Sequence, residues 1–234
     1  MPSENRMKPS PPDVLFFGSC VAEEDYQYLV QNETGPIQHA AQKVCWFFIK
    51  GIEATLGGCD LLLSQRVSPY PVFRKLVAFN LKARDRANAN TLRYVPYLTL
   101  PGTRYLTTSV MALFRLLAWF WSTRTSSQRF IIVYAMYLPH ILPTLVASSF
   151  TRVKTVMIIP DLPEFMSFAA HSRISSLMRN INVKIAHWIA SNFDGLVLFS
   201  QNMAQRVDCS KLKWIVVEGC VELSVGEADV PVTV

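Results

Sequence analysis

Short runs of apolar residues alternate along this chain with longer segments whose apolar positions recur every three or four residues. The short runs are rich in β-branched and aromatic residues and have few polar positions, which is typical of strands buried on both faces. A weaker run at Leu92–Tyr97 predicts one additional short strand. Clear strands are expected at Asp13–Phe17, Asp60–Ser64, Phe130–Tyr134, Val153–Ile159, Gly195–Phe199 and Trp214–Val217.

The segments between these runs predict helices. Gly35 and Pro36 are expected to open the first helix, since glycine is tolerated at an N-cap and proline suits the first turn. Its apolar positions recur on one helical face until Gly57 and Gly58 end it. Other helices are expected at Leu106–Trp121, from Pro139 onward and at Ile174–Ala190.

Strands that alternate with helices predict an α/β protein with a Rossmann-like, doubly wound, mostly parallel sheet. A polar, acidic loop is expected after the first strand, over Glu23–Asp25 and Gln31–Thr34. We expect residues 13–222 to form the domain, with a disordered tail at 1–12 and a tail or truncated inter-domain linker at 223–234. The motifs GxxxxGK[ST], GxGxxG and GxSxG are all missing, which argues against a P-loop, a dinucleotide fingerprint and a serine hydrolase.

Composition supports a folded, intracellular chain. Half of the 234 residues are hydrophobic and 17% are charged, enough apolar material for a large core. Five cysteines without CxxC spacing argue against a disulfide framework and a zinc site, and favour reduced, mostly buried thiols in the cytosol. No metal is expected, because His140, His171 and His187 show no metal-ligand spacing.

The net charge of +6 is concentrated in one window of the sequence. Between Arg66 and Arg104 there are eight basic residues and a single acidic one, Asp85. Such a patch attracts phosphates, an acidic membrane surface or nucleic acid. Nucleic acid ranks lowest of the three, because the flanking aromatic residues do not form a recognisable stacking platform.

The apolar segment Leu106–Trp121 follows the basic window and is too short to span a bilayer. Tryptophans at one end and cations upstream suit a membrane interface, whereas a helix buried against the sheet would be equally apolar. We favour the membrane, because the two features adjoin. The residues expected to contact a membrane or another anion are Arg74, Lys75, Lys82, Arg84, Arg86, Arg115, Trp119 and Trp121.

The strand Val153–Ile159 leads into the acidic loop PDLPE. Ligands of open α/β sheets bind at the carboxyl ends of strands, and the two prolines stiffen this loop. Asp161 and Glu164 are therefore candidates for a hydrogen-bonding or general-base role towards a substrate hydroxyl. The alternative is that Asp161 only caps the following turn or helix.

Two residues near the first helix are candidates for substrate binding. Gly35 would let a phosphate approach the helix-end amides, although it is equally compatible with an ordinary helix start. His39, one turn further, could point into the same cleft, or be a partly buried polar residue of no special role.

The PDLPE loop, the DGLVLFSQNM strand and turn, and the VVEG exit together resemble the amino-terminal half of a family 4-like glycosyltransferase of the GT-B fold. The resemblance covers Asp13 to about Glu222. It implies transfer of a sugar from a nucleotide-sugar donor to an acceptor hydroxyl, without a bound metal or other cofactor. It places Asp161 in the acceptor loop, and Gly35 next to the donor phosphates, where the family often has paired glycines.

In that family a donor-binding domain with a paired-glutamate motif follows the position of Gly219, after which this sequence has fifteen residues. The resemblance therefore implies an acceptor-binding half that needs a separate donor-domain subunit, or a truncated and inactive product. Acceptors of similar transferases are often lipid-linked, which implies polysaccharide or glycolipid assembly at the cytoplasmic, inner face of a membrane. The alternative is a catalytically incomplete, membrane-associated interaction or accessory protein with a Rossmann-like fold.

Overall fold

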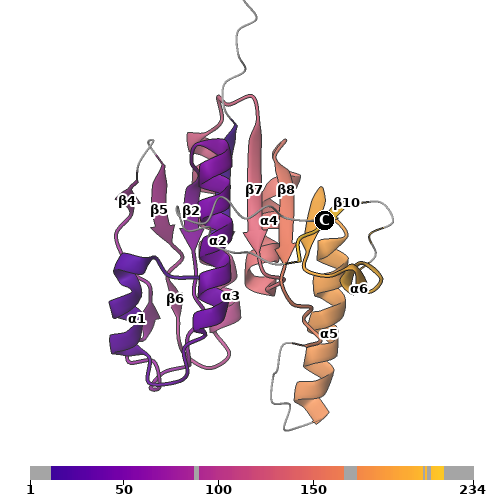
Figure 1. Cartoon of the computed structure of the whole chain (residues 1–234). Helices are drawn as coiled ribbons and strands as arrows, with labels where there is room; N and C mark the ends of the chain where they lie inside the picture. The colour runs from indigo at the N-terminus through magenta and orange to yellow at the C-terminus, as the bar shows by residue number, and fades with distance from the viewer. Residues whose placement is uncertain (1–11, 87–89, 166–172, 208, 210–211, 219–234) are drawn as a thin grey trace, which may run out of the picture.

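Eight strands form one twisted sheet in the computed structural model, which describes residues 12–86, 90–165, 173–207, 209 and 212–218 (Figure 1). Adjacent strands are parallel, apart from the antiparallel pair of β4 and β5 at one edge. From edge to edge the order is β10 (Lys213–Val216), β9 (Gly195–Leu198), β8 (Lys154–Ile159), β7 (Arg129–Tyr134), β1 (Asp13–Gly18), β2 (Asp60–Leu63), β5 (Thr91–Tyr94) and β4 (Arg84–Asp85).

Helices connect the strands. The fold class predicted from the sequence is confirmed, as the sheet is mostly parallel and helices lie on both of its faces. A small two-stranded sheet of β3 (Val77–Ala78) and β6 (Tyr97–Leu98) accompanies the main one. The helices are α1 (Tyr26–Asn32), α2 (His39–Leu56), α3 (Arg104–Ser122), α4 (Leu138–Ser149), α5 (Arg173–Ala190) and α6 (Gln201–Ala204), with a 3-10 turn at Glu23–Asp25.

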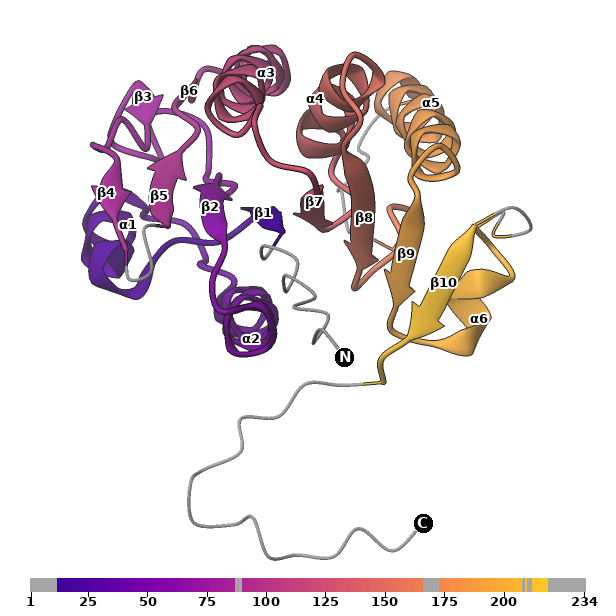
Figure 2. The ribbon, with the colours of Figure 1, turned by 90° about the horizontal axis from the view of Figure 1, so that it is seen from above.

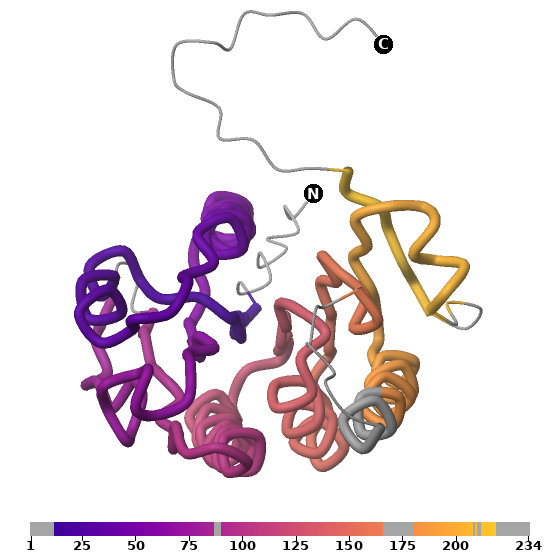
Figure 3. Tube along the Cα trace, turned by 90° about the horizontal axis from the view of Figure 1, so that it is seen from below, coloured from indigo at the N-terminus to yellow at the C-terminus, as the bar shows by residue number. Residues whose placement is uncertain are grey.

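The helices lie on opposite faces of the sheet. Figure 2 shows α3, α4 and α5 side by side over one face and α2 over the other. The view from below in Figure 3 gives the same arrangement. Strand β1 shows why both faces are apolar: Leu15 and Phe17 point into the core beneath α3–α5, whereas Val14 and Phe16 join the core beneath α1 and α2. The continuous apolar run of β1 is therefore required by its central position in the sheet.

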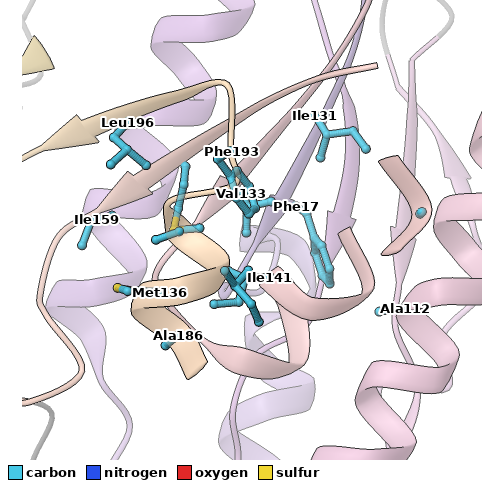
Figure 4. Close-up of a cluster of buried hydrophobic side chains, with 14 of the residues drawn as sticks. Phe17, Ala112, Ile131, Val133, Met136, Ile141, Ile159, Ala186, Phe193 and Leu196 are labelled. Atoms are coloured by element: carbon cyan, nitrogen blue, oxygen red, sulfur yellow. The ribbon is translucent and has the colours of Figure 1, made fainter. Parts of the chain in front are cut away.

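The core beneath α3–α5 combines alanine, branched, aromatic and methionine side chains from helices and sheet (Figure 4). Ala112 from α3, Ile141 from α4 and Ala186 from α5 pack over strand residues such as Val133. Alanines let the helix backbones approach the sheet closely, and branched residues fill the space between them. This core holds the three helices in fixed positions relative to one another.

Three carboxylates fasten the edge of the sheet at which the parallel strands begin. Asp60 Oδ1 accepts the backbone N–H of Thr91 (2.7 Å), and its Oδ2 accepts the Trp119 indole N–H (2.8 Å). In the same way Asp194 accepts the backbone N–H of Thr155 (2.9 Å) and pairs with Lys154. These bonds to the charged form hold the pKa of Asp194 below its ordinary value. Asp13, which starts β1, accepts a hydrogen bond from Ser126.

The sequence analysis did not predict one helix in the connection between β1 and β2. The segment after β1 was expected to be a polar loop, but it contains helix α1, whose Tyr28 packs on Phe73 and Phe79. The tails expected at 1–12 and 223–234, and the domain limit at 222, fall almost wholly outside the described residues, which begin at Pro12 and end at Glu218.

The cysteines that the structure describes are buried, as expected. They are Cys20, Cys45, Cys59 and Cys209. Cys20 and Cys45 touch each other, with 3.1 Å between their sulfur atoms. Burial and this neighbour raise the pKa of the Cys45 thiol, so this sulfur stays protonated in the core.

Candidate functional site

A cavity of about 410 Å³ opens at the edge of the sheet where the parallel strands end. Its lining comes from three segments: the stretch from Leu29 in α1 to Gln38 before α2, the residues that follow β2, and the first residue of α3. This is the edge at which open α/β sheets bind ligands, and the volume suits a small molecule. The lining residues are Leu29, Glu33, Pro36, Ile37, Gln38, Gln65, Arg66, Val67, Ser68, Pro69 and Arg104.

One wall of the cavity is held in place by the buried Glu33. Its Oε1 accepts the backbone N–H of Gly35 (2.9 Å), and its Oε2 accepts the backbone N–H of Ser68 (2.7 Å). The carboxylate thereby ties the segment before α2 to the segment after β2. A side chain at Gly35 would place its Cβ 2.8 Å from the Ser68 hydroxyl, so a larger residue here would have to displace the Ser68 side chain.

This wall corrects the expected role of Gly35. Helix α2 begins at His39 rather than at Gly35 and Pro36, and its N-cap residue is Gln38. The residues from Gly35 to Gln38 precede the helix and form part of the cavity wall. The backbone N–H of Gly35 is already bonded to the Glu33 carboxylate. Gly35 is therefore a point of close backbone approach and not the phosphate-facing end of a helix.

Substitution of Glu33 by alanine is expected to lower the free energy of unfolding by about 3 kcal/mol, because two N–H groups lose a charged acceptor. Chemical denaturation would measure this loss. Glu53→Ala is the matched control, since Glu53 forms an ion pair with Arg86 in a partly exposed position, which contributes about 1 kcal/mol or less. Equal losses in the two variants would contradict the assigned role of Glu33.

Arg104 presents a positive charge to the cavity. Its Nη1 donates to the carbonyl of Val67 (2.7 Å), and its guanidinium also hydrogen-bonds to Tyr137. Burial raises the pKa of Tyr137 to about 12, so this phenol stays neutral, and Arg104 partly opposes the rise. Among the described residues Arg104 has no carboxylate partner, and its buried Nε has no hydrogen-bond acceptor. With the exposed Arg66 beside it, the cavity favours an anion.

Gln65 adds a neutral polar group to the same cavity. The side chain is buried, and its Oε1 has no hydrogen-bond donor in the described structure. The backbone around it is fixed, because the Tyr97 hydroxyl donates to the Gln65 carbonyl (2.6 Å) and accepts from the Val67 N–H (3.2 Å). An unpaired amide oxygen in a fixed position is suited to accept a ligand hydroxyl.

The predicted acidic pair lies on the same edge, at the end of β8. The structure separates the roles of its two members. Glu164 is held by His187 of α5, with 2.9 Å between Oε1 and Nε2, and its Oε2 is buried without a donor. Asp161 is exposed and has no hydrogen-bond partner among the described residues. Asp161 is therefore the carboxylate available to a ligand, whereas Glu164 is engaged in the fold.

The candidate residues do not converge on a single point. Strands β1 and β7 lie between β2, which leads into the cavity, and β8, which leads to Asp161, so the two places are roughly 14 Å apart. His39 lies outside the cavity lining and is exposed, with its Nδ1 hydrogen-bonded to the Tyr26 hydroxyl (2.7 Å). The edge thus holds a basic cavity and, separately, an exposed carboxylate.

Between these two places, His140 is fully buried at the start of α4. Its ring stacks on Phe17, with 4.2 Å between ring centroids, and meets Tyr137 edge-on at 4.9 Å. Neither ring nitrogen has a partner in the described structure, and burial lowers the pKa of His140 to about 3. The imidazole is therefore neutral and acts as an aromatic packing residue.

The cations of the predicted basic patch are divided between ion pairs within the fold and exposed positions. Arg84 pairs with the buried Asp25, which raises the pKa of Arg84, and Arg86 pairs with Glu53 and lies over the Trp46 ring. These two arginines are committed to the fold around α1 and α2. Three of the expected anion contacts are exposed: Arg74, Lys75 and Lys82.

The expected membrane contacts on α3 are divided between its two faces. Trp119 is wrong as a membrane contact, because it is 3% exposed and its indole donates to Asp60 beneath the helix. Arg115 is also turned towards the sheet, since it lines a small internal cavity together with Trp119 and its Nε is buried. Trp121, in contrast, is 72% exposed.

The part of the chain that the structure describes contains no group of three His, Cys, Asp or Glu side chains placed to hold a metal ion. No helix within those residues is both long and apolar enough to cross a membrane.

Searches of protein families and of curated proteins find no match to this sequence. Among solved structures, a sucrose-phosphate synthase from Thermosynechococcus elongatus matches 87% of the chain at 8% identity, with a TM-score of 0.50 over 47% of its own length. The fold is one half of a GT-B architecture. An alpha,alpha-trehalose-phosphate synthase (UDP-forming) from Burkholderia vietnamiensis matches 86% of the chain at 10% identity, with a TM-score of 0.46 over 43% of its length. The chain thus spans less than half the length of either protein.

Sequence reasoning missed this cavity. Arg66 and Arg104 were considered only as the limits of the basic window, and Gln65 was not singled out. The available signal was the SQR run directly after the apolar strand Asp60–Leu63, at the edge where ligands are expected.

Proposed function

We propose that this domain is the acceptor-binding half of a glycosyltransferase. The enzyme would transfer a sugar from a nucleotide-sugar donor to an acceptor hydroxyl, and family 4-like transferases are the group it resembles. The observation that carries the proposal is the cavity with Arg104 and Gln65 at the carboxyl edge of a GT-B-like sheet. The donor would be held by a second domain, in the same or a separate polypeptide.

In this proposal the acceptor carries an anionic group and several hydroxyls. The anion, a phosphate or a carboxylate, would pair with Arg104 and Arg66, while Gln65 Oε1 accepts a hydroxyl. The reacting hydroxyl would reach Asp161, which takes its proton as the oxygen bonds to the donor sugar and the nucleoside diphosphate leaves. The roughly 14 Å between β2 and β8 favours an acceptor longer than one sugar ring.

A lipid-linked acceptor would fit these requirements, since the phosphate that joins sugar to lipid supplies the anion. The proposed location is then the cytoplasmic face of a membrane, in polysaccharide or glycolipid assembly. No metal or other cofactor is part of the proposal, because guanidinium groups and helix-end amides are able to bind phosphate without one.

Arg104→Met is expected to weaken the binding of a sugar phosphate by about tenfold to a hundredfold, because a charge-assisted hydrogen bond is lost. Isothermal titration of the chain with sugar phosphates, neutral oligosaccharides and inorganic phosphate would measure it. Arg74→Met is the matched control, since Arg74 is an exposed cation outside the cavity. Unchanged melting temperatures would show that both variants are folded.

Two results would contradict the proposal. Neutral oligosaccharides that bind as well as sugar phosphates would remove the need for an anionic group. Equal affinities for the Arg104 and Arg74 variants would place the ligand outside the cavity.

The second candidate function is a catalytically incomplete accessory protein that associates with a membrane or a partner transferase. The observation in its favour is the exposed apolar side chain of Trp121 on α3, which an internal helix would bury. The two functions differ in turnover, as an accessory protein would not release nucleoside diphosphate from any nucleotide sugar when combined with its partner.

A further inference from the structure

The outer surface of α3, α4 and α5 is apolar, although it points away from the sheet. On α3 the exposed apolar residues are spaced by three or four positions, which places them on one helical stripe. Helices α4 and α5 each carry a similar stripe. The residues are Leu106, Val110, Phe114, Leu117 and Trp121 on α3, Leu142, Val146 and Phe150 on α4, and Ile181, Ile185 and Trp188 on α5. We call this set the apolar helical face.

The three stripes form one continuous surface. Helix α4 packs against α3 on one side and α5 on the other, and all three lie on the same side of the sheet (Figure 2). The most exposed members are Phe150 (80%), Trp121 (72%), Leu106 (69%) and Phe114 (64%). Surfaces of soluble monomers seldom gather so many large apolar side chains, so this face indicates an interaction site.

The charges on the three helices all have one sign. Helices α3, α4 and α5 contain no aspartate or glutamate, and no acidic residue occurs between Asp85 and Asp161. At the ends of α3 and α4 the exposed Arg124 and Arg152 flank Trp121 and Phe150, and Arg124 lies 5.0 Å from the Trp121 ring centroid. The exposed Asp161 follows the end of β8, at the opposite edge of the sheet from Arg152.

We propose that the apolar helical face docks onto a membrane surface that contains anionic lipid. Tryptophan and phenylalanine side chains favour the boundary between head groups and acyl chains, and arginines beside them pair with lipid phosphates. The absence of acidic residues from the three helices removes the repulsion that an anionic surface would otherwise cause. This inference rests on the membrane location proposed above. It assigns the membrane contact to the apolar helical face instead of the basic window.

Helix α3 runs from the cavity to the opposite edge of the sheet. It begins with Arg104 in the cavity wall and ends at Ser122, so Trp121 lies near the edge where the strands begin. Leu106 is the member of the apolar helical face nearest in sequence to the cavity. One helix thus connects the cavity with the proposed membrane contact.

Vesicle flotation of the full chain tests the proposal, with vesicles of phosphatidylcholine alone and of phosphatidylcholine mixed with phosphatidylglycerol. The chain is expected to float with the anionic vesicles. Phe114→Ser combined with Trp121→Ser should reduce the bound fraction about tenfold or more. Arg124→Gln combined with Arg152→Gln should lower binding to the anionic vesicles towards the level seen with phosphatidylcholine.

The control is Val30→Ser combined with Leu56→Ser, since both residues are exposed apolar positions outside the face, on α1 and α2. Thermal unfolding checks that every variant folds. Binding that survives the Phe114 and Trp121 substitutions, or no binding to either vesicle, would overturn the proposal. So would a dimer in solution that these substitutions convert to monomer, as the face would then bind a second copy. Sugar-phosphate titrations test the proposed function separately and are unaffected by these outcomes.

Discussion

Asp161→Asn is expected to slow sugar transfer by about 10² to 10⁴-fold, the usual contribution of a general base, without destabilising the fold. Asparagine keeps the size and hydrogen-bonding capacity of aspartate but takes up no proton. Asp161 is exposed at the end of β8 and bonds to no described residue, so its replacement breaks no contact within the domain. The loss would therefore be one of chemistry alone.

The measurement requires the chain together with its donor-binding domain. The tagged chain would be recovered from its host in gentle detergent, its partners identified by mass spectrometry, and release of nucleoside diphosphate followed with a panel of nucleotide sugars. Glu164→Gln is the informative comparison, since Glu164 is held by His187 and its Oε2 is buried. This variant should lose stability and keep more activity than Asp161→Asn.

The opposite result would reassign the acidic pair. If Glu164→Gln abolished transfer at unchanged stability while Asp161→Asn remained active, the engaged carboxylate would be the base. Full activity in both variants would show that the PDLPE loop takes no part in sugar transfer. The basic cavity would then remain as the candidate site.

Acidification from pH 6.5 to pH 5 is expected to lower the free energy of unfolding by about 2 kcal/mol through His140 alone. The pKa of His140 falls from 6.5 in the unfolded chain to about 3 in the fold, because the ring is fully buried and neither nitrogen is bonded. The stability is complete above pH 6.5, where both states have a neutral ring. It is lost as pH falls towards 3, since only the unfolded chain binds the proton.

Chemical denaturation at a series of pH values would measure this slope, about 1.4 kcal/mol per unit of pH. His140→Leu should flatten the profile between pH 6.5 and 4, and the exposed His39→Leu should leave it unchanged. Asp194, whose pKa is lowered, acts in a different window, because its stabilisation is lost only as pH falls below the usual range of aspartate. If His140→Leu does not fold, the chemical shifts of the His140 ring protons would be followed against pH in the unsubstituted chain. Titration of the ring near pH 6.5 would contradict its burial.

Most of the sheet could be predicted from the sequence because each central strand is buried on both faces, as Phe16 and Phe17 show in β1. Hydrophobic burial alone then specifies the strand. Helix α1 could not be predicted in this way. Its aromatic residue Tyr28 packs on Phe73 and Phe79, more than forty positions further along the chain, so its stability comes from a long-range contact.

The parts of the site that escaped prediction depend on pairings between distant residues. The capture of the Gly35 amide by Glu33 shifts the start of α2 to His39, and local propensity does not contain that bond. Periodicity also fails to distinguish Trp119 from Trp121, since both lie on an apolar helix. The distinction comes from Asp60, which accepts the Trp119 indole and so decides which side of α3 faces the sheet.

The carboxylates Asp13, Asp60 and Asp194 stiffen one rim of the domain, while the opposite rim has Gln65, Arg104 and Glu164 with buried atoms that lack partners. The three polar groups are already buried and in place in the absence of a ligand. A ligand that supplies their missing hydrogen-bond partners would therefore spend little of its binding energy on rearranging the protein, so this rim is preorganised for binding.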